Sequence, residues 1–114
     1  MHIVGAFPNF VKAAPVIRHV DPSIKQVLIH TGQHYDSKMS DVFFDNLKIP
    51  RPTESLNIGS GTHAVQTGRV MIEIESCLKR YKPELVLVYG DVNSTLGAAI
   101  SAVKMNIKLA HVES

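Results

Sequence analysis

The chain has 114 residues, enough for one small domain, and a net charge of +2 at pH 7. Its lysines and arginines are scattered, so nucleic acid is not expected as a partner, because following a phosphate backbone requires a basic stripe. No apolar run is long enough for a membrane span, no secretory signal is visible, and the single cysteine cannot form an internal disulfide. These features predict a cytoplasmic protein.

The first half of the chain predicts strands that alternate with helices. The expected strands are residues 2–6, 25–30 and 55–58. The expected helices are residues 10–19 and 40–47. Asn9 is suited to cap the first helix and Pro15 to bend it, while Ser37 or Ser40 can cap the second.

The second half continues this alternation. The expected strands are residues 85–88 and a short strand that starts at 108 and leads to Glu113. The expected helices are residues 62–81 and 96–105. In the longer helix the apolar residues Val70, Ile74, Cys77 and Tyr81 recur every three or four positions, which predicts a core position for Cys77.

This order predicts the α/β class, with one Rossmann-like domain over residues 1–114. Strands that alternate with helices form a parallel sheet with helices on both faces, joined by right-handed crossovers. The run at 85–88 is apolar without alternation, as expected for a strand that is covered on both sides.

Acidic residues follow the last two predicted strands. Asp91 comes after Gly90, which permits a tight turn, and Glu113 ends the next strand. Because ligands bind at the carboxyl ends of strands in open α/β sheets, both acids could face one crevice and act in acid–base chemistry. The alternative is that Asp91, Asn93 or Ser94 caps the following helix, which position alone favours, and that Glu113 is an unrelated turn residue.

Two further patterns have simpler explanations than ligand binding. The loop at 59–62 could hold a phosphate, but Thr62 as the cap of the next helix is the favoured reading. The six histidines predict no metal site, since His30 and His34 lie across a strand end and a loop. His2 and His19 are expected to face solvent, and His111 to be packed or hydrogen-bonded within its strand.

Five segments carry a family resemblance by their order and spacing. They are Thr31-Gly32-Gln33-His34-Tyr35-Asp36, Gly59-Ser60-Gly61-Thr62-His63, Gln66-Thr67-Gly68-Arg69, Gly90-Asp91-Val92-Asn93-Ser94-Thr95 and His111-Val112-Glu113-Ser114. Together they resemble the amino-terminal domain of the non-hydrolysing UDP-N-acetylglucosamine 2-epimerases. The opening segment at 5–15 resembles the first loop and helix of that family.

The resemblance implies half of a glycosyltransferase-B-like fold and an epimerase that needs no cofactor or metal. Members of the family invert C2 of UDP-N-acetylglucosamine, by elimination and re-addition of UDP, in pathways to cell-surface polysaccharide. It implies that Asp91 and Glu113 are catalytic acids and that Lys12 and Asn93 bind substrate. It also implies a second, activating sugar-nucleotide site, to which Gln33, His34 and Arg69 correspond.

The chain departs from the family at three places, one of which is a first strand that is shorter by a few residues. Phe7 stands where the family has an arginine, which removes a cation suited to bidentate phosphate binding. The sequence stops at Ser114, before the second domain, so the isolated chain is expected to be inactive. Two alternatives are a non-catalytic module that binds sugar nucleotides and an interaction protein that completes a split enzyme. The expected partners are a UDP-sugar and either a second copy or a chain with the second domain.

Overall fold

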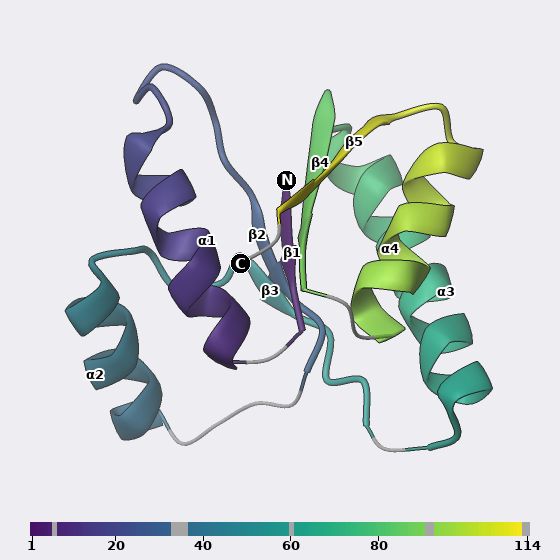
Figure 1. Cartoon of the computed structure of the whole chain (residues 1–114), viewed down its shortest axis with the longest axis horizontal. Coiled ribbons are helices and arrows are strands. Elements are labelled where there is room, and N and C mark those ends of the chain that lie inside the picture. Colours follow the sequence, from purple (N-terminus) through teal and green to yellow (C-terminus); the bar gives the residue numbers. More distant parts are fainter. Residues whose placement is uncertain (6, 33–36, 60, 91–92, 113–114) are drawn as a thin grey trace.

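The computed structural model describes residues 1–5, 7–32, 37–59, 61–90 and 93–112, without the side chains of residues 7, 37–40, 93 and 94. Strands and helices alternate throughout the described part of the chain, and the third strand is the shortest (Figure 1). The strands are β1 (His2–Val4), β2 (Leu28–His30), β3 (Glu54–Ser55), β4 (Leu85–Tyr89) and β5 (Lys108–Val112). The helices are α1 (Phe7–His19), α2 (Ser37–Leu47), α3 (His63–Tyr81) and α4 (Asn93–Lys104).

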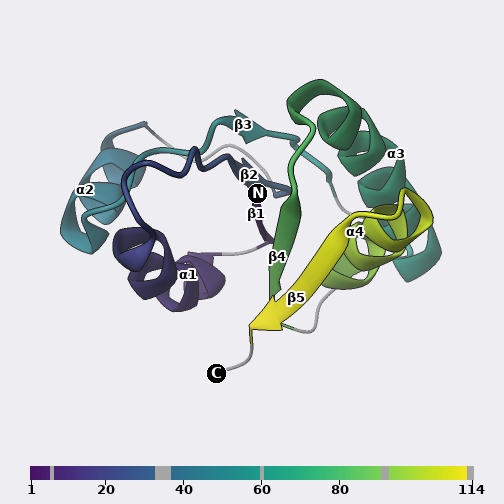
Figure 2. The same cartoon turned by 90° about the horizontal axis from the view of Figure 1, so that it is seen from above.

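The five strands form one parallel sheet in the order β3-β2-β1-β4-β5. β1 is central, where Ile3 is opposite Ile29 of β2 and Val88 of β4. Helices α1 and α2 lie on one side of the sheet and α3 and α4 on the other, as Figure 2 shows from above. The predicted class, a parallel Rossmann-like sheet with helices on both faces, is confirmed.

Two apolar layers hold the helices on the sheet. On the α3–α4 side, the core includes Ile74, Cys77 and Ala102. On the α1–α2 side it includes Phe10 and Phe44, whose rings meet edge to face at 5.1 Å between centroids. The short strands β1 and β2 are buried throughout, because helices cover both of their faces.

The largest differences from the predicted boundaries, three residues each, are at three helix starts, the start of β2 and the end of β3. Helices α1, α2 and α4 each begin three residues before the predicted position. Asn9 therefore lies inside α1 and does not cap it, contrary to prediction. Pro8 fits the first turn of α1, where a backbone N–H has no helical partner in any case. The first two predicted strands were also too long, since β1 stops at Val4 and β2 starts at Leu28.

Helix α3 agrees with the prediction at both ends. The Thr62 side chain accepts a hydrogen bond from the Val65 backbone N–H at 3.2 Å, which confirms Thr62 as the cap. The helix ends at Lys82, whose left-handed backbone has a φ of 48° and whose N–H donates to the Leu78 carbonyl. Arg80 and Tyr81 then donate to the Glu54 carboxylate, at 2.8 and 2.6 Å, and so tie the helix to β3.

Cys77 is buried in α3, as predicted. Burial, and then the nearby Glu54 carboxylate, raise the pKa of its thiol to about 11. We expect the native thiol to resist alkylation at pH 8, because the thiolate is the reactive form. Labelling by iodoacetamide in a urea series should follow the unfolding transition measured by circular dichroism. Rapid labelling without urea would show that Cys77 is accessible.

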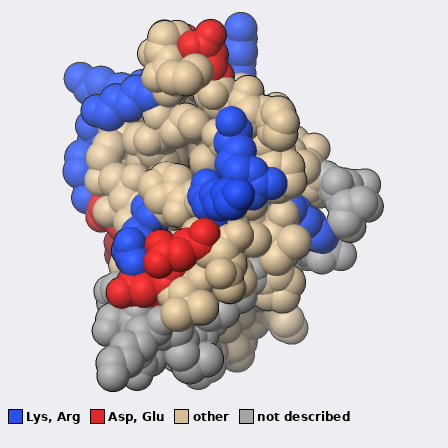
Figure 3. Space-filling view, turned by 90° about the vertical axis from the view of Figure 1, so that its left-hand side faces the viewer, with Lys and Arg blue, Asp and Glu red and all other residues tan. Residues whose placement is uncertain are grey.

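The surface has the scattered charge that the sequence predicts. Figure 3 shows the face over α1 and α2, where basic side chains stand in separate groups and acidic side chains lie near some of them. Arg51 and Asp41 form an exposed ion pair, for example. Among the described residues, no helix combines the length and apolar character needed to cross a bilayer.

Candidate functional site at the carboxyl edge of the sheet

The side of the sheet to which successive strands are added changes at β1. From β1 it builds outward to β2 and β3, and it then returns to add β4 and β5 on the other side. The loops after β1 and β4 therefore leave in opposite directions at the carboxyl edge. Such a switch point is where open α/β sheets bind their ligands, so the candidate site lies between these two loops.

Gly90 forms the turn at the end of β4. Its φ of +81° lies in the region that favours glycine, and a Cβ there would lie 3.0 Å from both amide atoms of Asn9. Asn9 is buried in the first turns of α1, so the segments after β1 and β4 are in direct contact. The Asn9 amide is a site feature that the sequence analysis missed, because its side chain was assigned to a helix cap.

Two side chains hold the backbone around Gly90. Thr95 Oγ1 of α4 donates to the Tyr89 carbonyl at 2.8 Å, and His111 Nε2 of β5 donates to the Gly90 carbonyl. The prediction that His111 is packed or hydrogen-bonded within its strand is confirmed by this bond, although the residue is exposed. Neighbouring elements thus fix the backbone directly before Asp91.

The end of β2 approaches the end of β1 closely. A Cβ at Gly32 would lie 3.0 Å from His30 Nε2 and 3.1 Å from the Gly5 carbonyl oxygen. The Thr31 N–H donates to the Val4 carbonyl at 3.0 Å, so both strands end at the same level. Buried His30 packs edge to face on Phe10, with 5.2 Å between ring centroids. This part of the edge leads into the segment that carries Gln33 and His34.

The structure describes three of the predicted site residues. Lys12 lies partly buried on α1, Asn93 is the first residue of α4, and Arg69 is exposed on α3. Lys12 and Arg69 are therefore on opposite faces of the sheet (Figure 2). The other four, Asp91, Glu113, Gln33 and His34, lie outside the described residues. Within the described part, no group of three or more His, Cys, Asp or Glu is arranged to hold a metal ion.

His2 is buried, contrary to the prediction that it faces solvent. Gln26 Nε2 donates to the Ile17 carbonyl at 3.1 Å, which leaves Gln26 Oε1 to accept from His2 Nε2 at 2.7 Å. His2 Nδ1 then accepts from the Tyr89 hydroxyl, also at 2.7 Å. The His2 imidazole is thus neutral, with its proton on Nε2. Burial raises the pKa of Tyr89 to about 12, so the phenol keeps the proton that it donates to His2.

This arrangement predicts that stability falls in mild acid. Burial is the main reason that the pKa of His2 is lowered from its usual 6.5. Below about pH 6.5, His2 binds a proton in the unfolded chain but not in the folded chain. The free energy of unfolding therefore decreases as the pH falls, until the pH reaches the lowered pKa of His2 in the folded state. Urea unfolding between pH 7.5 and 5 should show a smaller loss for His2→Gln than for the wild type. Equal losses would mean that His2 is not responsible.

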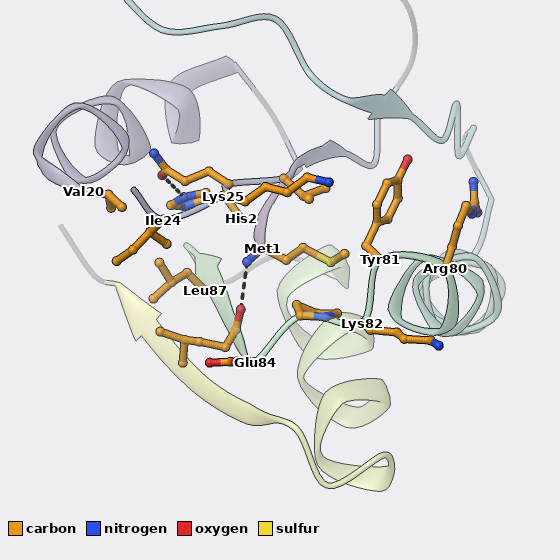
Figure 4. A pocket seen from close by; sticks show the side chains of 14 residues that line it. Met1, His2, Val20, Ile24, Lys25, Arg80, Tyr81, Lys82, Glu84 and Leu87 are labelled. Atoms are coloured by element: carbon orange, nitrogen blue, oxygen red, sulfur yellow. Dashed lines mark hydrogen bonds between the residues drawn. The ribbon is translucent and has the colours of Figure 1, made fainter. Parts of the chain in front are cut away.

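A pocket of about 640 Å³ lies at the opposite, amino-terminal edge of the sheet (Figure 4). Val20, Ile24 and Leu87 form an apolar wall, and Tyr81 stands across from them. The Met1 amino group donates to the Leu85 carbonyl at 2.8 Å within it. Because strands of a parallel sheet start at this edge, the pocket is separate from the site at the carboxyl edge.

The fold and the switch point define a Rossmann-like α/β protein, a class in which ligands bind at the carboxyl edge of a parallel sheet. The family model described as "UDP-N-acetylglucosamine 2-epimerase" matches residues 18–114. The chain therefore belongs to the UDP-N-acetylglucosamine 2-epimerase family.

Known relatives match almost all of the chain. It is 54% identical to a UDP-N-acetylglucosamine 2-epimerase homolog of Methanococcus maripaludis, over 98% of the chain and 31% of that protein. It is 45% identical to the UDP-2,3-diacetamido-2,3-dideoxy-D-glucuronate 2-epimerase of Pseudomonas aeruginosa, over 98% of the chain and 32% of that protein. The chain thus spans about a third of the length of these relatives.

A solved structure gives the same result for the fold. The UDP-N-acetylglucosamine 2-epimerase of Methanocaldococcus jannaschii, in complex with UDP-N-acetylglucosamine and UDP, matches with a TM-score of 0.87. The two chains are 46% identical, over 97% of this chain and 31% of that one. The described fold is therefore one part of the larger epimerase fold, as the family resemblance predicted.

Proposed function

We propose that this chain is the amino-terminal part of a cytoplasmic UDP-N-acetylglucosamine 2-epimerase and contributes the acidic side of its active site. The observation that carries this proposal is the Gly90 turn, which lies at the switch point directly before Asp91, is held by Thr95 and His111, and packs against Asn9. A backbone fixed on several sides is what a catalytic group needs for accurate positioning. Relatives that are named as this epimerase support the substrate.

In the proposed reaction the configuration at C2 of the sugar is inverted. A base removes the C2 proton, the C1–O bond breaks with its electron pair going to UDP, and a C1–C2 double bond forms. UDP then adds back to C1 while C2 receives a proton on the opposite face. We assign the proton transfers to Asp91 and Glu113, because a weakly acidic C–H requires a positioned base and acid.

Binding of the charged nucleotide is assigned to other residues. Lys12 on α1 supplies a cation for the diphosphate, and Asn93 at the start of α4 contacts the substrate. Gln33, His34 and Arg69 are proposed to form the second, activating sugar-nucleotide site. We assign the rest of the active site to the part of the epimerase that this sequence does not cover, since the relatives are about three times longer.

Exchange of the C2 proton tests this proposal. The chain is incubated with UDP-N-acetylglucosamine in deuterated water, and the C2 proton signal and ligand line widths are followed by NMR. Loss of the C2 signal with the wild-type chain would show that its acids work without the second domain. Asp91→Asn should then slow this exchange at least about a hundredfold, a typical acid–base contribution. Asp45→Asn, an exposed acid on α2, is the matched control and should match the wild type.

The remaining outcomes separate the alternatives. Broadened ligand lines without exchange would favour a non-catalytic module that binds sugar nucleotides. If neither proton exchange nor line broadening is seen, the result would favour a chain that needs its partner. Because one relative is named for UDP-2,3-diacetamido-2,3-dideoxy-D-glucuronate, that sugar nucleotide is tested in parallel. Exchange that is faster with it would reassign the substrate.

A further inference from the structure

We propose that the pocket at the amino-terminal edge of the sheet binds a small aromatic carboxylate. Its volume of about 640 Å³ falls within the roughly 300–1,000 Å³ that is typical of small-molecule sites. The start of β1, the segment between α1 and β2, the end of α3 and the start of β4 together enclose it. None of the described residues assigned to the epimerase reaction lines it, so the inference does not rest on the proposed function.

One wall of the pocket is aliphatic and in contact with water. Val20 and Ile24 follow α1, Leu87 belongs to β4, and Leu85 of the same strand also lines the pocket. Ile24 is 58% exposed and Leu85 41% exposed, although both are large apolar residues. Single exposed apolar residues are ordinary, but these two line one concave surface. An apolar ligand would remove this surface from water, which is favourable in proportion to the area covered.

An aromatic ring stands across the pocket from this wall. Tyr81 is the last residue of α3, and its hydroxyl donates to the Glu54 carboxylate at 2.6 Å, which holds the ring in place. The Arg80 guanidinium is 5.5 Å from the centre of this ring, and Figure 4 shows it on the side away from the aliphatic wall. A flat ligand ring between Tyr81 and the wall would contact both, and aromatic pairs are favourable beyond the area that they bury.

The polar groups deeper in the pocket already have partners. His2 Nε2 donates to Gln26 Oε1 and His2 Nδ1 accepts from the Tyr89 hydroxyl, both at 2.7 Å. Gln26 Nε2 donates to the Ile17 carbonyl at 3.1 Å. A polar group of a ligand would therefore gain little there, since these side chains are bonded to one another. The inner part of the pocket suits carbon, and a charged group of the ligand belongs at the mouth.

The charged side chains of the lining favour an anion at the mouth. Three are basic, Lys25, Arg80 and Lys82, and one of the described residues is acidic, Glu84. Arg80 is paired with the Glu54 carboxylate at 2.8 Å, which leaves two exposed lysines and one carboxylate. Figure 4 shows the Lys25 side chain extending over the pocket toward Tyr81. An ammonium group forms a charge-assisted hydrogen bond with a carboxylate, so Lys25 is the expected partner of the ligand's charge.

Titration of the full chain with 2-naphthoate tests the proposal. Two-dimensional NMR of the isotope-labelled protein follows the amide signals while the ligand is raised to about 5 mM near neutral pH. Saturable shifts are expected in the segments 20–27 and 80–87, with a Kd of ~1 mM or tighter, as ligands of this size reach. 2-Naphthol has the same ring system and no charge at this pH, and should bind at least about fivefold more weakly.

Four variants locate the site. Ile24→Asp should weaken 2-naphthoate binding at least about tenfold, because it places a charge in the apolar wall. Val42→Asp is its matched control, since Val42 is 60% exposed on α2 and does not line the pocket. Lys25→Gln should remove most of the preference for 2-naphthoate over 2-naphthol. Lys104→Gln, at the exposed end of α4, should keep it. The same spectra show whether each variant is folded.

Several results would overturn the proposal. They are an absence of saturable shifts, equal binding of 2-naphthol, tighter binding of the aliphatic acid decanoate, and equal weakening by Ile24→Asp and Val42→Asp. UDP-N-acetylglucosamine should not displace 2-naphthoate, since the sugar nucleotide is assigned to the opposite edge of the sheet. Displacement would place the aromatic acid in that site and would also overturn the proposal. Failure of the C2 exchange experiment, by contrast, would leave this pocket's ligand unchanged.

Discussion

Gly97→Ala is expected to lower the free energy of unfolding by about 2 kcal/mol, the usual cost of forcing an extra methyl group into a packed interface. The new Cβ would lie 2.8 Å from Val70 Cγ1 and 3.0 Å from the Thr67 carbonyl oxygen. Neither atom is the end of a flexible side chain, so α3 and α4 would have to separate. Ser101 would then lose its 3.1 Å hydrogen bond to the Met71 carbonyl.

Gly68→Ala is the matched control, because it makes the same chemical change inside a helix where the Cβ meets nothing. It should raise stability by up to ~1 kcal/mol, the difference in helix propensity between the two residues. Both variants are compared by urea unfolding at the same protein concentration. Equal effects of the two changes would show that the helices do not approach closely at Gly97.

Gly90→Ala is expected to cost about 2 kcal/mol and to disturb the candidate site. The φ of +81° is unfavourable for any residue with a Cβ, by ~1–2 kcal/mol, and the methyl group would also press on the Asn9 amide at 3.0 Å. Gly61→Ala is the control, since its nearest neighbour is the exposed side chain of Val65 at 3.3 Å, and it should change stability by less than ~0.5 kcal/mol.

A double-mutant cycle separates the two costs at Gly90. In an Asn9→Ala background the steric contact is gone, so Gly90→Ala should cost less than in the wild type, with a coupling of at least ~0.5 kcal/mol. The backbone cost remains in both backgrounds. Strict additivity would mean that α1 and the β4 turn do not touch, and would remove the contact that defines the site. Urea unfolding of all four proteins provides the measurement.

Much of the fold could be predicted because local pattern and tertiary structure agree in most segments. The run at 85–88 is apolar throughout and forms a strand that is buried at Val86 and Val88, although Leu85 at its start is exposed. The spacing of Val70, Ile74 and Cys77 placed the core side of α3 correctly. Helix starts were predicted less well. Asn9 is a good cap by residue type, but its amide contacts Gly90, about eighty residues further along the chain.

The site was predictable in its position but less so in its parts. Gly90 indicated a turn, and the polar residues after β4 indicated a site at the carboxyl edge. No local pattern showed that His111 would hold the Gly90 carbonyl, or that His2 would be buried beneath Tyr89. Those contacts depend on strand order, which brings together residues that are 21 and 87 positions apart. Sequence spacing carries no information of that kind.

The central position of β1 has a consequence for the growing polypeptide. Its three residues are buried, and on one side they pair with Leu87 and Val88. Translation at roughly 5–20 residues per second would delay that neighbour by ~4–17 s after the first strand is made. During this time β1 can pair only with β2, so its other edge stays open. A strand that is made well before β4 is thus completed only when β4 arrives, and its open apolar edge is a natural target for chaperones that bind exposed apolar segments.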